Sequence, residues 1–371
     1  MRIAIDAIPL LVRSAGVKNY LFYWISHLRQ LLGDRQVPLF PFLDHLPDLN
    51  HEGSIVDPVG TLARQGLLYA LNLQPNRVWD WIGPRTDIFH TTKLLNPPRL
   101  PRLTATVYDM TCWLLPEFHQ PANVAAEKRF AGRIWKRAAG LIAISESSRR
   151  DAVRILGLNP EIIRVIYPGV PQPFFEATAG TAAPTCLKHG LARPYALCVG
   201  TVEPRKNLDR LLDSWQSLPA SVRESFDLVV AGPEGWRSAG TMARLRCPAA
   251  GVRYLGYVPE TDLPALTAGA TVFLYPSLYE GFGFPVAQAM AAGVPVITSN
   301  LSSLPEITGG AALLIDPRSV AEIGAALERL LTSPANRAQM AQAGRAHAQR
   351  FRWDVCARHS VEFFETVLGR G

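Results

Sequence analysis

Cysteine and long apolar runs are scarce in this sequence of 371 residues. The five cysteines are scattered and form no C-x-x-C pair, which argues against a zinc site or a disulfide framework and fits a reducing cytosol. No apolar run reaches the roughly eighteen residues that a membrane span needs. The first residues also lack the cleavage region of a signal peptide. We therefore expect a soluble, cytoplasmic protein.

The composition is that of a folded protein with a positive charge. A hydrophobic fraction of 48% and a charged fraction of 19% are typical of globular chains, and the length favours two domains. The formal net charge of +7 favours an anionic partner: a nucleotide, a phospholipid surface or a nucleic acid. No RNA- or DNA-binding motif accompanies this charge, so we expect no nucleic acid partner.

Short strand patterns alternate with helical patterns along the whole chain, which predicts α/β domains with parallel sheets. One series lies within 1–172 and a second within 191–350, starting at "YALCVGTV". Between them, 173–190 is rich in Pro, Ala, Gly and Thr without periodicity, and we expect a linker there. An amphipathic helix is expected in 351–371. A cleft between the two domains would favour a ligand site.

One stretch of the second series, Leu278 to Thr298, predicts a Gly-rich turn between a strand and a helix. "TVFLYPS" is typical of a buried strand, Pro285 suits the first turn of a helix, and Gly293 suits the residue after its end. The turn carries Glu280 and lies at the carboxyl end of the strand. Ligands bind at that edge of parallel sheets, and free N–H groups at a helix start attract phosphate.

Three further turns follow strands of the same series. "GTVEPRKNL" places Arg205 and Lys206 before a helix, where two cations can neutralise a diphosphate; the alternative is a solvated loop. "VVAGPEG" ends a strand at Gly232, where a ligand can approach the backbone. In "YLGYVPETDL", the backbone of Tyr257 and Val258 could meet a base edge, and the alternative is a plain turn.

Together these turns resemble the donor half of a retaining glycosyltransferase of glycosyltransferase family 4, which has the GT-B fold. The resemblance covers most of 195–316 through "GTVEPRKNL", "VVAGPEGW", "VRYLGYVPETDLPAL" and "PSLYEGFGFPVAQAMAAGVPVITSNLSSLPEI". The first domain is similar more loosely, through "SAGVKNYL", "TDIFHTTK", "AISESSRRD" and "VIYPGV". The resemblance implies two Rossmann-like, doubly wound domains that face a cleft. The first would bind acceptor, the second nucleotide sugar, and the C-terminal helix would pack toward the first.

The resemblance also assigns roles to residues. Arg205 and Lys206 would hold the donor diphosphate, Glu280 would bind hydroxyls of the donor sugar, and His90 and Asp109 would lie near the reacting centre. The remaining donor-binding residues implied are Gly16, Gly200, Thr201, Gly232, Tyr257, Val258, Gly281, Phe282, Gly283, Phe284 and Gln288.

Two positions depart from the family pattern. Gln288 stands where a second glutamate usually holds the donor ribose; glutamine can still accept from a hydroxyl but brings no charge. Tyr108 stands where many relatives have a histidine, which puts a catalytic role of that position in doubt. No D-x-D triplet occurs, so we expect no metal and no cofactor, with cations and helix N-termini stabilising the leaving nucleotide.

The acceptor side is expected in the first domain. "AAEKRFAGRIWKRAAG" places Arg129, Arg133, Lys136 and Arg137 at helical spacing, which is consistent with contact to an anionic membrane surface. Leu67, Leu68, Trp79 and Trp81 could form an acceptor wall. The alternatives are a solvated face and an ordinary core.

The resulting hypothesis is a transferase that moves a hexose, preferably mannose from GDP-mannose, to a glycan or a lipid-linked saccharide. A sugar-nucleotide epimerase of the same fold and a catalytically degenerate nucleotide-sugar-binding protein are the alternatives. Donor base, acceptor, linkage and oligomeric state stay open.

Overall fold

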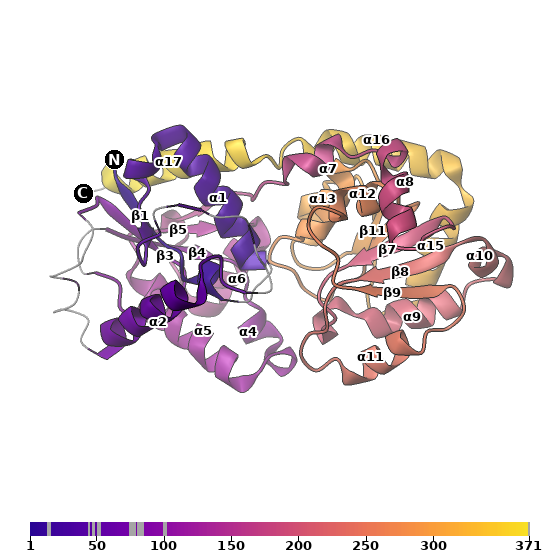
Figure 1. The fold of residues 1–371 in the computed structure, drawn as a ribbon, viewed down its shortest axis with the longest axis horizontal. Helices are drawn as coiled ribbons and strands as arrows, with labels where there is room; N and C mark the ends of the chain where they lie inside the picture. The colour runs from indigo at the N-terminus through magenta and orange to yellow at the C-terminus, as the bar shows by residue number, and fades with distance from the viewer. Residues whose placement is uncertain are drawn as a thin grey trace. The chain divides into compact units, whose positions relative to one another are not determined.

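The computed structural model describes residues 1–12, 16–43, 45–46, 49, 53–73, 79, 85–98 and 102–369. The chain divides into two compact units, each with its own six-stranded sheet (Figure 1). Unit 1 comprises Met1–Leu114, Gln120–Gly169 and Arg352–Gly371, and unit 2 comprises Leu115–His119 and Val170–Phe351. Within the described residues, no helix is both long and apolar enough to cross a membrane.

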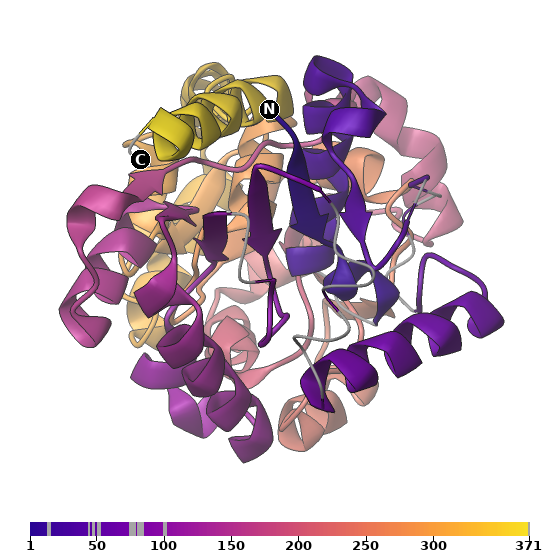
Figure 2. The ribbon, with the colours of Figure 1, turned by 90° about the vertical axis from the view of Figure 1, so that its left-hand side faces the viewer.

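The sheet of unit 1 is parallel and has the order β2-β1-β3-β4-β5-β6. Its strands are β1 (Ile3–Asp6), β2 (Leu39–Phe40), β3 (Ile88–Thr91), β4 (Arg102–Val107), β5 (Gly140–Ala143) and β6 (Ile163–Val165). Its helices are α1 (Gly16–Leu32), α2 (Pro58–Leu73), α4 (Thr111–Leu114), α5 (Pro121–Arg133), α6 (Glu146–Leu156) and α17 (Trp353–Gly369). Figure 2 shows α1 and α17 on one side of this sheet and α2 and α5 on the other.

The C-terminal helix α17 therefore belongs to unit 1. It packs along α1, and the indole Nε1 of Trp24 on α1 donates a 2.9 Å hydrogen bond to Ser360 Oγ on α17. Both partners are fully buried, so this bond joins the two ends of the chain in the core of unit 1.

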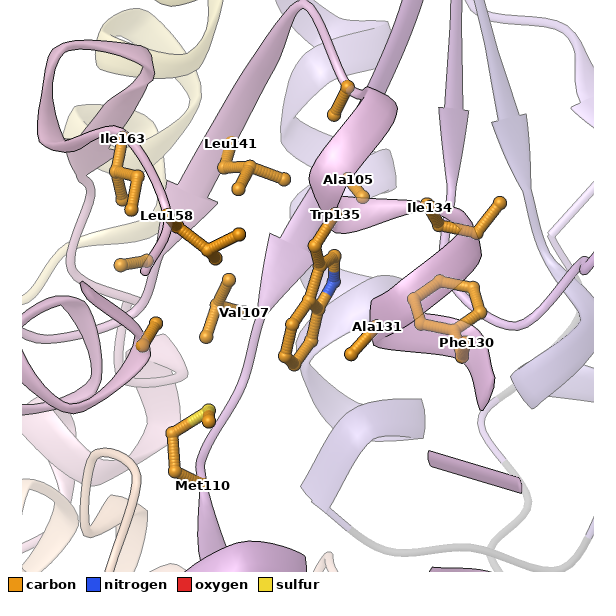
Figure 3. Packing of buried hydrophobic residues seen from close by; sticks show 13 residues of the cluster. Ala105, Val107, Met110, Phe130, Ala131, Ile134, Trp135, Leu141, Leu158 and Ile163 are labelled. Carbon is orange, nitrogen blue, oxygen red and sulfur yellow. The ribbon is translucent and has the colours of Figure 1, made fainter. Parts of the chain in front are cut away.

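On the opposite side, one apolar cluster of unit 1 is built by α5 and the turn that follows it. Phe130 and Ile134, four residues apart, point inward with Trp135 and pack toward Val107 on β4 and Leu141 on β5 (Figure 3). The four-residue spacing puts Phe130 and Ile134 on one face of a helix, which explains why this segment buries one stripe and exposes the other.

The sheet of unit 2 is parallel with the order β12-β11-β10-β7-β8-β9. Its strands are β7 (Tyr195–Val199), β8 (Asp227–Ala231), β9 (Val252–Gly256), β10 (Val272–Tyr275), β11 (Val296–Ser299) and β12 (Leu313–Ile315). Its helices are α7 (Gln172–Glu176), α8 (Ala179–Lys188), α9 (Leu208–Gln216), α10 (Ala220–Ser225), α11 (Ala239–Arg246), α12 (Leu263–Ala268), α13 (Phe284–Ala291), α14 (Leu304–Thr308), α15 (Val320–Thr332) and α16 (Pro334–Ala348). The strand order reverses between β7 and β10, which makes that position the switch point of the sheet.

The expected α/β class with two Rossmann-like domains is confirmed by these two sheets. The predicted helix after "LYEGFG" is also confirmed, with Pro285 in its first turn and Gly293, at φ +71°, just past its end.

The structure contradicts the expectation that 173–190 is a linker without regular structure. Residues 173–190 hold most of α7 and all of α8, and α8 packs on α12. Thr178 and Thr181 form a reciprocal capping box at its start, and the Ala-rich segment then continues as a helix through Pro184. Composition alone concealed this helix because the capping threonines resemble loop residues. Strand β2 was not foreseen, since two residues carry no periodicity.

Candidate functional site

The candidate site is built at the carboxyl ends of β7 and β10, at the switch point of unit 2. The loop after β7 carries Glu203, Arg205 and Lys206, and the loop after β10 carries Glu280. Parallel strands present their carboxyl ends at one edge, so two loops far apart in the sequence meet there. The expected meeting of "EPRKN" and "YEGFG" is thus a direct result of the sheet order.

The guanidinium of Arg205 is held by two carboxylates. Its Nη2 lies 2.5 Å from Glu203 Oε1, and its Nη1 lies 2.7 Å from Glu280 Oε2 and 2.8 Å from the carbonyl oxygen of Tyr279. The loop itself is fixed by Asn207, whose amide Nδ2 donates to the carbonyls of Pro276 and Pro317 at 3.1 and 2.6 Å. The guanidinium of Arg205 is therefore held in one orientation between Glu203 and Glu280.

Lys206 pairs with the other carboxylate oxygen of Glu280, Oε1. Its Nζ lies 2.7 Å from Glu280 Oε1 and 2.5 Å from the hydroxyl of Tyr275 on β10, and 4.9 Å from the centroid of that ring. Ser277 Oγ donates a further 2.6 Å hydrogen bond to Glu280 Oε1. Both oxygens of Glu280 are consequently paired with a cation.

Electrostatics keep this glutamate ionised. Burial, with 7% of Glu280 exposed, would raise the pKa of its carboxyl. The charges of Arg205 and Lys206 and the hydrogen bonds from Lys206 and Ser277 outweigh that effect and lower the pKa to about 2. The four side chains of Glu203, Arg205, Lys206 and Glu280 carry two charges of each sign. An anionic ligand that bound the cations would therefore compete with Glu280 for them.

Glu203 was not foreseen as part of the site. It is 4% exposed, and its Oε2 is buried without a hydrogen-bond partner in the part of the chain that the structure describes. A buried carboxylate oxygen without a donor is unfavourable unless a ligand or water satisfies it. Its position two residues before Arg205 was the signal that the sequence offered.

The strand ends at this edge pack backbone to backbone. Gly232, at φ +147°, ends β8 so close to β7 that a Cβ atom there would lie 2.0 Å from the carbonyl oxygen of Gly200. Any side chain at 232 would push Gly200 and Thr201 away from their places. Gly200 and Thr201 thus lie where expected, after β7, with Gly232 beside them.

The glycine-rich turn after β10 is anchored by two serines from the next strand end. The backbone N–H of Glu280 donates to Ser302 Oγ at 2.9 Å, and Ser303 Oγ donates to the carbonyls of Glu280 and Phe282 at 3.0 and 2.9 Å. Gly283 at φ +98° begins α13 against Leu304. Both serines follow β11, which is the neighbour of β10 in the sheet. Their position after that strand could have predicted that they lie beside the turn, and the sequence analysis did not use it.

The other expected donor residues of unit 2 lie on the same loops or on α13. Gly281, Phe282 and Gly283 are buried in the turn, and Phe284 is the first residue of α13. Tyr257 is 44% exposed and Val258 is buried, directly after β9. Gln288 is half-buried on α13, and its side chain makes no hydrogen bond within the described residues.

His90, expected near the reacting centre, lies in the interior of unit 1. It is the third residue of β3 and is fully buried, with its ring against Trp24 of α1 and Phe364 of α17. Its two ring nitrogens lie 3.0 Å from the hydroxyls of Thr104 and Thr106. Burial lowers its pKa to about 3, so the ring is neutral. These contacts make His90 a core residue of unit 1.

Asp109 follows β4 at the carboxyl edge of the first sheet. Its Oδ1 accepts from the backbone N–H of Thr111 at 2.9 Å and from the hydroxyl of that residue at 2.5 Å. Tyr108 packs edge-on against Tyr20, with ring centroids 5.4 Å apart. Glu127 on α5 was not foreseen here: burial, and then the charge of Asp109, raises its pKa to about 7.

Gly16 is the first residue of α1, which follows β1. The expected acceptor wall is not formed by Trp79, which is 7% exposed and donates from Nε1 to the carbonyl of Asn96 at 2.8 Å. Leu67 and Leu68 pack against the same apolar cluster, and Trp81 lies outside the described residues. Within the described residues, no group of three His, Cys, Asp or Glu side chains could hold a metal ion.

Comparison with known proteins connects this geometry to a family. Residues 187–347 match the model of the family described as "Glycosyl transferases group 1". The chain is 31% identical over 382 residues to O-antigen chain mannosyltransferase B of Escherichia coli, which covers 99% of this chain and 100% of that protein. It is 28% identical over 243 residues to an MMP alpha-(1->4)-mannosyltransferase of Mycolicibacterium hassiacum, covering 64% of this chain and 56% of that protein.

Solved structures agree in fold. Sucrose-phosphate synthase from Thermosynechococcus elongatus has a TM-score of 0.76 at 18% identity, with 100% of both chains covered. WaaG, a glycosyltransferase involved in lipopolysaccharide biosynthesis, has a TM-score of 0.71 at 17% identity, covering 96% of this chain and 98% of that one. The family match, the full-length relative and the shared fold lead to one conclusion: this chain belongs to the group 1 glycosyltransferases and has a glycosyl transfer role.

Proposed function

We propose that this protein is a retaining glycosyltransferase of family 4 that transfers a hexose from a nucleoside diphosphate to a saccharide acceptor. The observation that carries the proposal is the ion network of Arg205 and Lys206, both half-buried, with the buried Glu280 at the switch point of unit 2. Its two cations match a diphosphate, and its carboxylate matches the hydroxyls of a sugar bound next to that diphosphate.

In this proposal the donor diphosphate replaces Glu280 as partner of Arg205 and Lys206, and Glu280 turns its oxygens to the sugar. The backbone of Tyr257 and Val258 receives the base, and Gln288 binds the ribose. The acceptor oxygen attacks the anomeric carbon on the face from which the phosphate departs. A phosphate oxygen takes the acceptor proton, and the configuration is retained.

Charge stabilisation of the leaving group comes from protein cations in this scheme. The leaving diphosphate gains negative charge, and Arg205, Lys206 and the start of α13 supply positive charge beside it, so the proposed reaction uses neither metal ion nor cofactor. Asp109 and Glu127 in unit 1 are the proposed contacts to acceptor hydroxyls, because Asp109 follows β4 at the carboxyl edge of the first sheet and its charge acts on Glu127 of α5.

Mannose is the proposed sugar and GDP the proposed nucleotide. The names of two relatives support mannose, since both are mannosyltransferases and one of them aligns over its full length. The name of that relative, an O-antigen chain enzyme, supports a growing glycan or a lipid-linked saccharide as acceptor. A cytoplasmic location is proposed because sugar nucleotides are the donors.

Thermal unfolding with UDP, GDP, ADP and dTDP tests the donor site. A nucleotide at a hundred times its dissociation constant stabilises the fold by about 2.7 kcal/mol, and we expect this shift for GDP. Arg205→Ala should remove the shift, whereas Arg318→Ala, an exposed arginine of unit 2, should keep it. No shift with any nucleotide would contradict a functional donor site.

Transfer itself is measured with GDP-mannose and a mannoside acceptor. Transfer that depends on the acceptor supports the proposal. Conversion of the nucleotide sugar without acceptor would instead identify an epimerase. Binding with neither transfer nor slow donor hydrolysis would identify a degenerate binding protein.

A further inference from the structure

His347 on α16 is a histidine for which the proposed reaction has no use. Its ring packs against the backbone of Gly309, where a Cβ atom would lie 2.1 Å from Cε1 and 2.6 Å from Nε2 of the imidazole. The ring also lies edge-on to Phe351, with ring centroids 5.7 Å apart. Nε2 is buried and has no hydrogen-bond partner among the described residues. The imidazole is thus held mainly by its packing against Gly309 and Phe351.

The contact with Gly309 connects His347, through α14, to the turn that carries Glu280. Gly309 is the residue just past the end of α14, and Leu304 is the first residue of that helix. Leu304 packs on the turn so closely that a Cβ atom at Gly283 would lie 2.6 Å from its Cδ2. The two serines directly before Leu304 bond to the backbone of the same turn. The five residues of α14 rise by about 7.5 Å, so His347 and the turn hold the two ends of a short helix.

The contact with Phe351 reaches the same turn through a second aromatic ring. Phe351 and Phe282 are each 2% exposed, and their rings meet edge-on with centroids 5.4 Å apart. The ring of Phe282 also contacts that of Phe284, the first residue of α13, with centroids 5.1 Å apart. Both contacts of His347 therefore end on residues 280–284, two separate ways of supporting one short segment.

We propose that His347 is a positioning residue for Glu280. Its neutral ring keeps α14 and Phe351 packed on residues 280–284, and this segment holds the carboxylate in place. Protein interiors contain few voids, so a displaced ring would move the residues packed on it. This role rests on the proposed function, in which Glu280 binds the donor sugar, and it makes transfer sensitive to the protonation of His347.

The surroundings of the ring oppose its protonation. Burial, and then the charge of Arg350, lower the pKa of His347 below its usual 6.5, while the backbone of Ile307 acts in the opposite direction. Nearby on α16 is Arg345, α14 carries Glu306, and α13 carries no charged side chain. The stability that the neutral ring contributes is present above pH 6.5 and is lost as pH falls through the folded pKa. Acid should therefore loosen residues 280–284 and slow transfer.

Removal of the ring tests the support of the turn. His347→Ala should lower kcat for transfer about 10- to 100-fold at pH 7.5, because a small displacement of a group at the reacting sugar is costly. Affinity for GDP should stay within about twofold, since Arg205 and Lys206 lie on the other loop. Hydrogen–deuterium exchange of the backbone amides of 280–284 should be about tenfold faster. The matched control is His359→Ala, an exposed histidine of α17, which should change none of the three.

An uncharged side chain of similar length tests the effect of the proton. His347→Gln should transfer about threefold more slowly than the wild type at pH 8.0, because its amide fills the place of the ring less well. Between pH 8.0 and pH 4.5, transfer by the wild type should fall about threefold more than transfer by His347→Gln, since glutamine takes up no proton. Glu280, with a pKa of about 2, stays ionised over this range. His359→Gln should follow the wild type.

The outcomes distinguish this role from the proposed transferase activity. A wild type that transfers no sugar would contradict that activity, and the exchange of 280–284 in His347→Ala would still test the support of the turn. Unchanged kcat in folded His347→Ala, with or without faster exchange, would overturn the positioning role and leave His347 a purely structural residue. Parallel pH profiles of the wild type and His347→Gln would overturn the effect of the proton. Circular dichroism and melting temperatures at both pH values identify any variant that has unfolded.

Discussion

The two sheets switch strand order at equivalent places, and the chain uses these two edges differently. In unit 1 the edge between β1 and β3 holds Asp6, whose Oδ2 accepts from the backbone N–H groups of Thr92, Lys93 and Leu94 at 2.8 to 2.9 Å. In unit 2 the edge between β7 and β10 holds Glu280, whose oxygens face side chains.

The partners decide what each carboxylate can do. Backbone donors are fixed by the loop, so Asp6 cannot release them unless the loop after β3 changes its conformation. Arg205 and Lys206 carry their charges on side chains that can exchange one anion for another by rotation. The same strand order thus gives different results in the two units. In unit 1, Asp6 and its backbone donors form a structural clamp. In unit 2, Glu280, Arg205 and Lys206 form an ion network whose partners can exchange. Four substitutions test this contrast.

Glu280→Gln should have the largest effect. We expect transfer to fall about 100- to 1000-fold, as when a charged hydrogen-bonding group at the reacting sugar is removed. Affinity for the nucleoside diphosphate should stay within about threefold or improve, since the variant no longer competes for Arg205 and Lys206. Transfer rates and calorimetric binding of the diphosphate measure the two quantities separately.

Glu328→Gln, an exposed glutamate on α15, is the control for this substitution and should leave both quantities unchanged. A Glu280→Gln protein that is folded but has lost diphosphate binding would assign Glu280 to the phosphates instead of the sugar.

Arg205→Ala should invert that pattern. Loss of a guanidinium that pairs with a diphosphate is expected to weaken binding by about 2 to 3 kcal/mol, or roughly 30- to 150-fold. The measurement is the dissociation constant of the diphosphate at fixed ionic strength. Equal affinity in the variant and the wild type would show that the ion network of unit 2 is structural, like the clamp of Asp6, and would remove the contrast between the two edges.

The sequence predicts the parts of the site that depend on strand order, and it does not predict the parts that depend on loop conformation. Strand periodicity and the turns "EPRKN" and "YEGFG" predict both the sheets and the cluster of Arg205, Lys206 and Glu280, because parallel strands align their carboxyl ends. Glu203 and Ser302 escaped prediction, since their partners depend on loop conformations that no periodicity encodes. The burial of His90 escaped prediction for a related reason. A strand end does not reveal whether a side chain points to the edge or to the helices behind the sheet.

His90→Phe should affect stability and leave ligand binding intact. The hydroxyls of Thr104 and Thr106 lose their ring partner, which costs about 2 kcal/mol at pH 7.5. The pKa of His90 is about 3 in the folded chain, below its usual 6.5, so its contribution to stability is present above pH 6.5 and is lost as pH falls.

The free energy of unfolding should therefore fall with acid more steeply in the wild type than in His90→Phe, by up to about 1.4 kcal/mol per pH unit below pH 6.5. Urea titrations at pH 7.5, 6.0 and 5.0 measure this difference. A variant of normal stability whose transfer rate drops a hundredfold would restore a catalytic role for His90.

Glu127→Gln should give the smallest effect. Glu127 lies on α5, and among the described carboxyl groups of unit 1 it has a pKa moved to near neutral. Burial and the charge of Asp109 raise that pKa from 4.5 to about 7, so the folded chain favours the protonated form. The contribution to stability is present below pH 4.5 and is lost as pH rises through 7. Glutamine imitates the protonated acid at every pH. The rise in pKa from 4.5 to about 7 corresponds to at most about 3 kcal/mol, and solvent screens part of this at a half-buried carboxylate. We expect the variant to equal the wild type near pH 4.5 and to exceed its unfolding free energy by about 1 kcal/mol at pH 8.5. Glu161→Gln, an exposed glutamate of unit 1, should show no such difference between the two pH values. If the free energy of unfolding of Glu127→Gln at pH 8.5 equals that of the wild type, another group must stabilise the ionised carboxylate of Glu127. Unit 1 would then hold an ion network like that of unit 2 in addition to the clamp of Asp6.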